Sequence, residues 1–488
     1  MRKFIKAVLI TTILSVFTRA LGLFIKIYIS RIIGAELLGY YQIALSFFFL
    51  LCTLVTSGIP LVISRMIASK PQNQSKVVFS GLVLSSCISI IVCLFVVLFP
   101  NIISAIWGQH NSLPVLFTLL PAVIFTAIYV PFRGSFWGNK NFFLLGFTEL
   151  VEQVFRFVAC IILFNLSTHL TGAEIAGTTY SIACIFSSIM AIAIYFIKGG
   201  KIKPNIKFIP TLVSTSAPIA AMRIGSSIVG LLISLLFPAM LVKTGISLTD
   251  AISFFGILTG MVLPLISIPG TIISSISIAL IPEVSGKNFN FISRQINMAL
   301  SYSMIISFIL IPVLLTLGTP IGVLLFNDTT AGELLTIGSI LILPLGVCQI
   351  SSSILNAIGK EKQGLITYII GAGSMLISII LLPQVIGIYS LLAGFFLMNT
   401  TTALLNLIII NNYLTKQSIK TLFFSILYLI PSCLICYWSY KILLQFTPLF
   451  ISIAIAGGLS ITCMILLYQA FNFINIKDYI PDKLKLHA

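Results

Sequence analysis

The chain has 488 residues, of which 58% are hydrophobic and 8% are charged, and its formal net charge is +17. An ordinary soluble domain has roughly a quarter of its residues charged, so this composition excludes a soluble enzyme. The positive charge lies in short loops rather than on a water-exposed domain with interleaved aromatic residues, so it does not indicate nucleic-acid binding.

Apolar segments follow one another along the whole chain. About 20 apolar residues cross a bilayer as a helix, and backbone groups in lipid must be hydrogen-bonded within their own segment. The first segment begins like a secretory signal but continues to Gly34 without a cleavage site, so we expect a retained helix. The sequence predicts an all-α polytopic membrane protein with about fourteen transmembrane helices, at 7–33, 40–68, 77–99, 113–137, 143–166, 173–197, 210–242, 251–282, 293–317, 333–358, 364–384, 387–411, 419–440 and 448–472.

Basic residues are distributed very unequally between the two sides of these spans. Of 28 Lys and Arg residues, nineteen lie at the N-terminus or in loops on its side, two lie on the other side (Lys243 and Lys441), and seven lie in or at the edges of spans. Loops rich in Lys and Arg stay in the cytoplasm, close to anionic lipid. We therefore expect a multi-pass protein of the cell (cytoplasmic) membrane with both termini in the cytoplasm.

The longest loop on the basic side, at 198–207, divides the chain after the sixth span. The fourth and tenth spans also resemble each other, since each contains a proline early in its core, Pro121 and Pro344, and ends in a glycine-containing turn. Both spans run toward the same side, which is typical of parallel repeats. The sequence predicts an N-terminal six-helix lobe at 1–200, a C-terminal six-helix lobe at 201–415, and a final helix pair with a tail at 416–488.

Three cations lie deep inside predicted spans. Arg19 and Arg223 each lie about twelve or thirteen residues into the first helix of their lobe, which is about 18–20 Å at 1.5 Å per residue. Lys26 follows Arg19 by two turns on the same face. A charge at mid-membrane costs about 2.5–3.5 kcal/mol, so it normally faces a cavity or a partner. We expect these residues to line a central cavity, and pairing with carbonyls or lipid headgroups is the alternative.

The fifth span contains Glu149, Glu152 and Arg156. Glu152 and Arg156 are spaced for a helical ion pair, with the acid first. Two interpretations stay open: a self-neutralised pair that holds helices together, or a substrate contact. Arg31, Arg65 and Arg133 lie nearer the membrane surfaces, where long side chains extend to the headgroups.

Glycine and proline interrupt several spans. Such residues are tolerated as kinks in membrane helices, and they also serve as hinges in transporters that alternate between two faces. We favour hinges at Gly58, Pro60, Pro218, Pro264, Pro269 and Gly270.

No motif for catalysis, nucleotide binding or metal binding occurs. The chain lacks the G-x-x-x-x-G-K-[ST] phosphate loop, and its three histidines are scattered. Cys433 and Cys436 form a C-x-x-C inside a span with no second pair nearby, so we interpret them as packing residues. We expect no enzymatic activity, no cofactor and no metal.

Several segments resemble the stage V sporulation protein B family. They are TRALGLFIKIYISRIIGAELLGYYQ at 18–42, SGIPLVISR at 57–65, RGSFWGNKN at 133–141 and EQVFR at 152–156. The resemblance implies the multidrug/oligosaccharidyl-lipid/polysaccharide flippase fold, two six-helix lobes in a V with a final helix pair. It also implies transport of undecaprenyl-diphosphate-linked saccharides, including the peptidoglycan precursor lipid II, and a link to spore cortex. Arg19 matches a cavity arginine of related flippases, whereas their eighth-span arginine is absent here.

Three functions remain open at this point. The leading one is a flippase in which Arg19, Lys26, Arg223 and Arg156 hold the diphosphate, with Arg65 and Glu152 as secondary contacts. The bilayer and the lipid-linked saccharide would be its partners, together with cell-wall synthesis proteins. A cation-coupled multidrug exporter would instead depend on a buried acid such as Glu152. A non-transporting scaffold for cell-wall synthesis would tolerate changes in the cavity.

Overall fold

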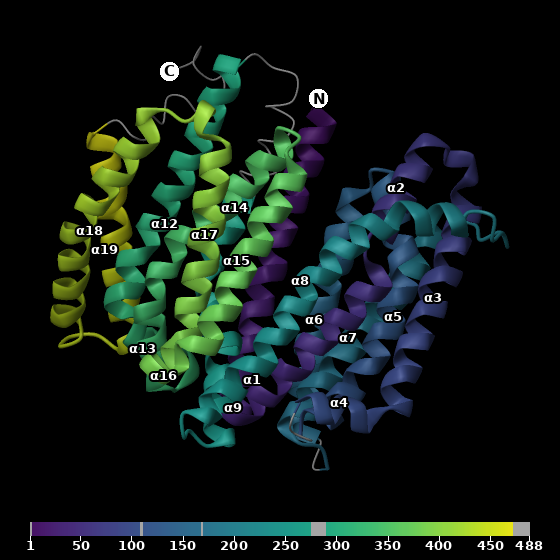
Figure 1. The fold of residues 1–488 in the computed structure, drawn as a ribbon, viewed down its shortest axis with the longest axis horizontal. Helices are drawn as coiled ribbons and strands as arrows, with labels where there is room; N and C mark the ends of the chain where they lie inside the picture. The colour runs from purple at the N-terminus through teal and green to yellow at the C-terminus, as the bar shows by residue number, and fades with distance from the viewer. Residues whose placement is uncertain (1, 108–110, 167–168, 275–288, 472–488) are drawn as a thin grey trace. The chain divides into compact units, whose positions relative to one another are not determined.

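The computed structural model describes residues 2–107, 111–166, 169–274 and 289–471 (Figure 1). The described residues form helices and turns and contain no strand. They group into two compact units, one within Met1–Met261 together with Pro383–Ile388, the other within Val262–Leu382 and Tyr389–Ala488. The end of the predicted eighth span and the C-terminal tail lie outside the described residues.

Unit 1 contains the helices α1 to α9 and the two short helical segments η1 and η2. In chain order these are α1 (Arg2–Thr56), α2 (Ile59–Ser69), the 3₁₀ turn η1 (Pro71–Asn73), α3 (Gln74–Leu98), α4 (Pro100–Trp107), α5 (Ser112–Gly138), α6 (Phe142–Leu166), α7 (Gly172–Ile197), α8 (Ile209–Lys243), α9 (Leu248–Gly256) and the π-helical segment η2 (Ile257–Val262). The short α16 (Pro383–Ile386) also groups with it.

Unit 2 contains the remaining elements. They are α10 (Leu263–Ile266), α12 (Phe289–Phe326), α13 (Thr329–Gly338), η3 (Ser339–Leu341), α14 (Ile342–Ala357), α15 (Glu361–Leu381), α17 (Ser390–Ile409), η5 (Asn411–Tyr413), α18 (Lys416–Leu443) and α19 (Leu449–Ala470). The turn η4 (Gly387–Tyr389) lies where the chain passes from one unit to the other.

Twelve segments of the described residues are long and apolar enough to cross a membrane. One of them, Leu14–Ser69, contains most of the first predicted span and all of the second. Helix α6 falls outside this set because it carries Glu149, Glu152 and Arg156. Counting the first segment as two and adding α6 gives the predicted number of about fourteen. The prediction of an all-α polytopic membrane protein is confirmed.

Two glycines break the long α1–α2 region at the predicted places. Gly34 lies inside α1 with a φ of 75°, and Gly58 separates α1 from α2 with a φ of 78°. This left-handed region penalises residues with a Cβ atom, which is why glycine occupies both positions. Pro60 then falls in the first turn of α2, where its missing N–H costs no hydrogen bond.

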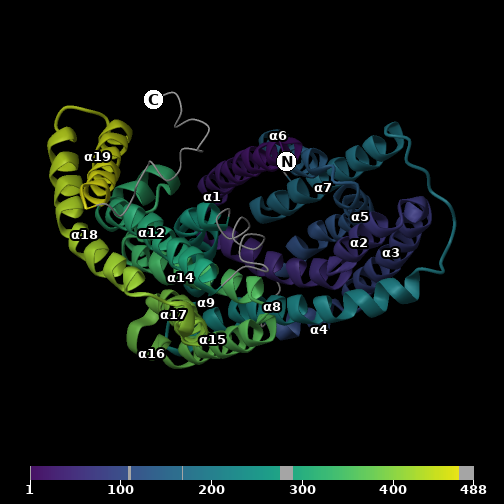
Figure 2. The same cartoon turned by 90° about the horizontal axis from the view of Figure 1, so that it is seen from above.

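The second half of α1 packs closely against α9. A Cβ atom added to Gly39 would overlap the backbone oxygen of Ile252, and one added to Gly256 would overlap that of Ala35. Small residues let membrane helices approach to backbone contact. This contact, together with α8 alongside α1 and α2 (Figure 2), places α8 and α9 in unit 1. The predicted lobes at 1–200, 201–415 and 416–488 stay a prediction.

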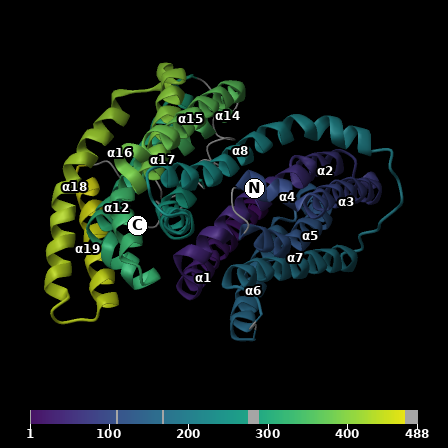
Figure 3. The same ribbon diagram turned by 60° about the horizontal axis from the view of Figure 1, so that its bottom comes forward.

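Side-chain hydrogen bonds join the helices of unit 2. The amide of Asn406 on α17 accepts a bond from Thr367 on α15 (2.6 Å) and donates to Ser351 (3.1 Å) and Ser352 (3.0 Å) on α14. The neighbouring helices α18 and α19 (Figure 3) are linked by a Ser432–Ser460 hydroxyl pair at 2.8 Å. Because lipid offers these groups no alternative partner, such bonds fix which helix faces meet.

Candidate functional site

A buried arginine lies at the meeting point of three helices in unit 1. Arg156 on α6 is 8% exposed, and its Nη2 donates a hydrogen bond to the hydroxyl of Tyr41 on α1 at 2.8 Å. Its guanidinium carbon lies 4.5 Å from the centre of the Tyr180 ring on α7, a cation–π geometry. Its Nε has no hydrogen-bond partner among the described residues. Two tyrosines therefore hold the charge in place of a carboxylate.

The predicted helical ion pair does not form. No ion pair within 4.0 Å joins Glu152 and Arg156, and Glu152 is half-buried. The one ion pair in the part of the chain that the structure describes joins Arg133 on α5 to Glu149 on α6 at 2.5 Å. Both side chains are partly exposed, 42% and 36%, which fits a position near a membrane surface. Arg156 thus keeps a net positive charge without a bonded acid.

One face of α1 presents further cations toward α6. Arg19, Gly22 and Lys26 follow one another at helical spacing, so they share that face. Gln153 of α6 approaches it, because its Oε1 lies 3.4 Å from where a Gly22 Cβ atom would be. That oxygen is buried and has no partner within the described residues. Lys26 lies near enough to Arg156 for their charges to repel.

Arg19, Lys26 and Arg223 are all exposed, and within the described ranges none makes a hydrogen bond through its side chain or an ion pair. Arg223 lies one turn before Ser227, whose hydroxyl meets that of Thr53 on α1 at 2.8 Å. Arg223 therefore lies on the face of α8 that meets α1. No described contact joins it to Arg19 or Lys26. Lys26 and Arg156 are thus within electrostatic range of each other, whereas no described contact links Arg223 to either of them.

The remaining predicted residues lie as follows. Arg65 and Arg31 are exposed, on α2 and α1. Gly58 packs against α8, because an added Cβ atom would come 2.8 Å from the backbone oxygen of Ser216. Pro218 follows within the same helix.

The second group of predicted hinges follows the point in the chain where unit 1 ends and unit 2 begins. Pro264 is the second residue of α10, which follows the π-helical segment Ile257–Val262 directly. Pro269 and Gly270 are buried in the helical residues 268–274, and a Gly270 Cβ atom would come 3.0 Å from Oε1 of Gln349. Helix interruptions at Gly58 and before Pro264 are therefore present, whereas motion about them stays a prediction.

No group of three or more His, Cys, Asp or Glu side chains with a metal-binding arrangement occurs in the described part of the chain. The cluster around Arg156 instead carries cations, hydroxyls and an amide, a set that suits an anion.

A family model described as polysaccharide biosynthesis protein matches residues 4–286, more than half of the chain. The chain belongs to the polysaccharide biosynthesis protein family. Stage V sporulation protein B of Bacillus subtilis (strain 168) is 27% identical over 302 residues, 58% of this chain and 58% of that protein. Sporulation protein YkvU of the same organism is 21% identical over 305 residues, 58% and 66% of the two chains. The predicted resemblance is confirmed, and the match spans less than two thirds of either relative.

Solved structures show the fold of this family member. The lipid II flippase MurJ in an inward closed conformation matches with a TM-score of 0.75 and 18% identity over 95% of this chain and 99% of that one. An inward-facing multidrug resistance MATE family transporter of the MOP superfamily matches with a TM-score of 0.66 and 12% identity over 80% and 93%. At these identities the matches establish the flippase and transporter fold.

The sequence patterns do not indicate Tyr41, Gln153 or Tyr180 as site residues. Each lies in an apolar span and has no unusual spacing, so only the packing of α1 and α7 against α6 reveals its role. A usable signal was the tyrosine pair Tyr40–Tyr41 at the start of the second predicted span, since a phenol offers a buried arginine both a hydroxyl and a ring.

Proposed function

We propose that the chain is a flippase that moves an undecaprenyl-diphosphate-linked saccharide from the inner to the outer leaflet of the cell membrane. The observation that carries the proposal is the set of cations on α1 and α6 that form no ion pair within 4.0 Å in the described structure. Lys26 lies within electrostatic range of Arg156, and Arg19 lies on the same face of α1 as Lys26. A diphosphate supplies the negative charge that this arrangement lacks.

The residues have different roles in this proposal. Arg19 and Lys26 are exposed and bind the diphosphate directly, and Arg223 meets it from α8. Arg156 is held by Tyr41 and Tyr180, so it acts as a positioning residue that keeps the region positive. With both termini in the cytoplasm and the inside negative, outward movement of each negative charge is favourable by about 2.3 kcal/mol per 100 mV.

Alternating access requires a contact that opens and closes. The α1–α9 contact at Gly39 and Gly256 lies past the Gly34 turn, away from the basic loops. In the proposed orientation it forms an outer gate. The breaks at Gly58 and at the π-helical segment before Pro264 then act as hinges, because each interrupts the helical hydrogen bonds next to a packed helix.

The test is a leaflet-accessibility assay in proteoliposomes that contain fluorescent lipid II, with dithionite added outside. Arg19→Glu, Lys26→Glu and Arg223→Glu should each abolish the protein-dependent increase in accessible label. Lys243→Glu, which reverses an exposed charge at the C-terminal end of α8, is the matched control and should retain it. Full activity in the three reversal variants would refute the assigned roles. Activity with a lipid-linked saccharide other than lipid II would correct the substrate alone.

The similarity to stage V sporulation protein B supports spore cortex peptidoglycan as the destination of the cargo. Expression of this chain in a sporulating strain that lacks that protein should restore cortex. Restoration that is lost with Arg19→Glu, while the protein still reaches the membrane, separates transport from a scaffold role.

A cation-coupled multidrug exporter is the second candidate. The MATE-like fold and the half-buried, unpaired Glu152 favour it. It predicts that Glu152→Gln abolishes efflux of a cationic dye, whereas the flippase predicts no such efflux in the unmodified protein.

A further inference from the structure

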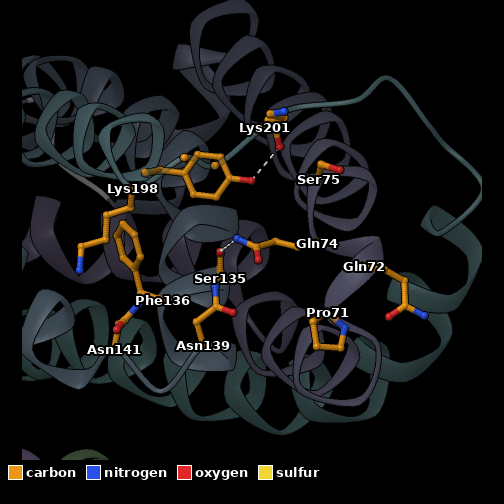
Figure 4. A pocket seen from close by; sticks show the side chains of 13 residues that line it. Pro71, Gln72, Gln74, Ser75, Ser135, Phe136, Asn139, Asn141, Lys198 and Lys201 are labelled. Atoms are coloured by element: carbon orange, nitrogen blue, oxygen red, sulfur yellow. Dashed lines mark hydrogen bonds between the residues drawn. The ribbon is translucent and has the colours of Figure 1, made fainter.

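A polar cavity of about 430 Å³ opens in unit 1 where three helix ends meet (Figure 4). It shares no residue with the cation cluster on α1 and α6. Its walls come from η1 and the start of α3, from the end of α5 and the turn after it, and from the end of α7. The lining residues that matter below are Gln74, Ser135, Asn139, Tyr195, Lys198 and Lys201.

Specific contacts hold these walls together. Gln74 donates a hydrogen bond from Nε2 to Oγ of Ser135 at 3.0 Å, which ties α3 to α5 (Figure 4). The hydroxyl of Tyr195 donates to the backbone oxygen of Lys201 at 2.8 Å. Gly200 is required in this turn, because an added Cβ atom would come 2.6 Å from the backbone oxygen of Tyr195.

Hydrogen bonds also hold the loop residues that follow Lys201 in place. The backbone N–H of Lys203 donates to the oxygen of Ser75 at 3.4 Å, and the hydroxyl of Ser80 bonds to the backbone oxygen of Asn205. The loop that follows α7 is therefore attached to α3 on one side of the cavity. The hollow is a formed feature of the fold.

The lining is positively charged and rich in donors. Lys198 and Lys201 line it together with four side-chain amides, and no Asp or Glu is among the lining residues. The C-terminal ends of α5 and α7 contribute about half a negative charge each, and the N-terminal end of α3 about half a positive charge. The three helix ends together leave about half a negative charge, and the two lysine charges exceed it. Size fits as well, since small-molecule sites usually enclose about 300–1,000 Å³.

We propose that this cavity binds the phosphate group of an anionic ligand through Lys198, Lys201 and the neighbouring amides. The cavity lies among the basic loops, on the side that the proposed orientation places in the cytoplasm. Two sources share this chemistry: the headgroup of an anionic phospholipid, which the inner leaflet presents at this depth, and free phosphate from solution. Binding is a property of unit 1 and is measured without transport.

The test uses the full-length protein in a detergent that permits native mass spectrometry. Phosphatidylglycerol is titrated in one arm, phosphatidylcholine with the same acyl chains in a second, and inorganic phosphate in a third. Lys198→Gln/Lys201→Gln should weaken anion binding at least tenfold, since each lysine lost removes a charge-assisted hydrogen bond. The matched control, Lys203→Gln/Lys207→Gln, removes the same charge from the same loop outside the cavity and should stay within about twofold.

Asn139→Trp provides a variant without any charge change. Asn139 is exposed on the cavity wall, so the indole fills the hollow without entering the core, and binding should fall as in the lysine variant. Phosphate that displaces phosphatidylglycerol, or binds alone, assigns the site to free phosphate, and lipid binding that resists phosphate assigns it to the headgroup. Equal losses in the two lysine pairs, or no preference for anions over phosphatidylcholine, would overturn the proposal. Size-exclusion elution like that of the unmodified protein shows that each variant folds.

Discussion

Removal of one hydroxyl group, by Tyr41→Phe, tests how unit 1 accommodates its buried cation. Tyr41 supplies the hydrogen bond that Arg156 makes among the described residues, at 2.8 Å. The guanidinium is 8% exposed and its Nε already has no partner, so water does not replace the lost bond. A hydrogen bond to a charged group contributes about 1.5–3 kcal/mol, and we expect Tyr41→Phe to lower the free energy of unfolding by that amount.

A double-mutant cycle isolates this bond. In the Arg156→Met background the charge is absent and methionine fills a similar volume, so Tyr41→Phe should then cost less than about 0.5 kcal/mol. Tyr180→Leu removes the cation–π contact at 4.5 Å and should cost about 0.5–2 kcal/mol beyond its packing term, again only when Arg156 is present.

The assay is reversible unfolding in mixed micelles with increasing fractions of a denaturing detergent, followed by circular dichroism. Lys243→Gln, at the exposed C-terminal end of α8, reports the effect of losing one remote charge. If Tyr41→Phe costs the same in both backgrounds, the hydroxyl does not stabilise the arginine, and the two tyrosines do not hold its charge.

Two other variants probe the packing of unit 1. Gly39→Leu should destabilise the α1–α9 contact by about 1–3 kcal/mol because its side chain would overlap Ile252, whereas Gly225→Leu, which faces open space, should be nearly neutral in the same unfolding assay. Glu149→Gln should cost less than about 1 kcal/mol, because its ion pair with Arg133 is partly exposed; a larger loss, which added salt does not reduce, would show that this pair is effectively buried.

Hydropathy and backbone chemistry were enough to predict the spans and the main helix breaks. The spans follow from apolar length, and the breaks at Gly34 and Gly58 follow from the residue that tolerates a positive φ. What hydropathy does not give is which face of a span meets which neighbour. In lipid both the packed and the outward faces of a helix are apolar, so the pattern that orients a soluble helix is weak here.

In the candidate site, too, the sequence pattern does not show which residues on different helices meet. Helical spacing suggested Glu152 as the partner of Arg156, but the structure pairs Glu149 with Arg133 and gives Arg156 two tyrosines. Spacing describes one helix at a time, whereas these contacts join different helices. The cations on α1 were predictable because a charge inside a span is conspicuous without any knowledge of its neighbours.

The positive charge of the candidate site favours the flippase function over the multidrug exporter function. An organic cation that approached Lys26 would also be repelled by Arg156, which lies within electrostatic range of Lys26 and is held by a hydrogen bond to Tyr41 and by the ring of Tyr180. A carboxylate in place of either tyrosine would have cancelled that charge. Glu152 is half-buried and forms no ion pair within 4.0 Å in the described chain, so it does not cancel the charge by direct pairing. An anion, in contrast, gains attraction from both cations at once, and the exposed ammonium of Lys26 suits direct contact with the oxygens of a diphosphate.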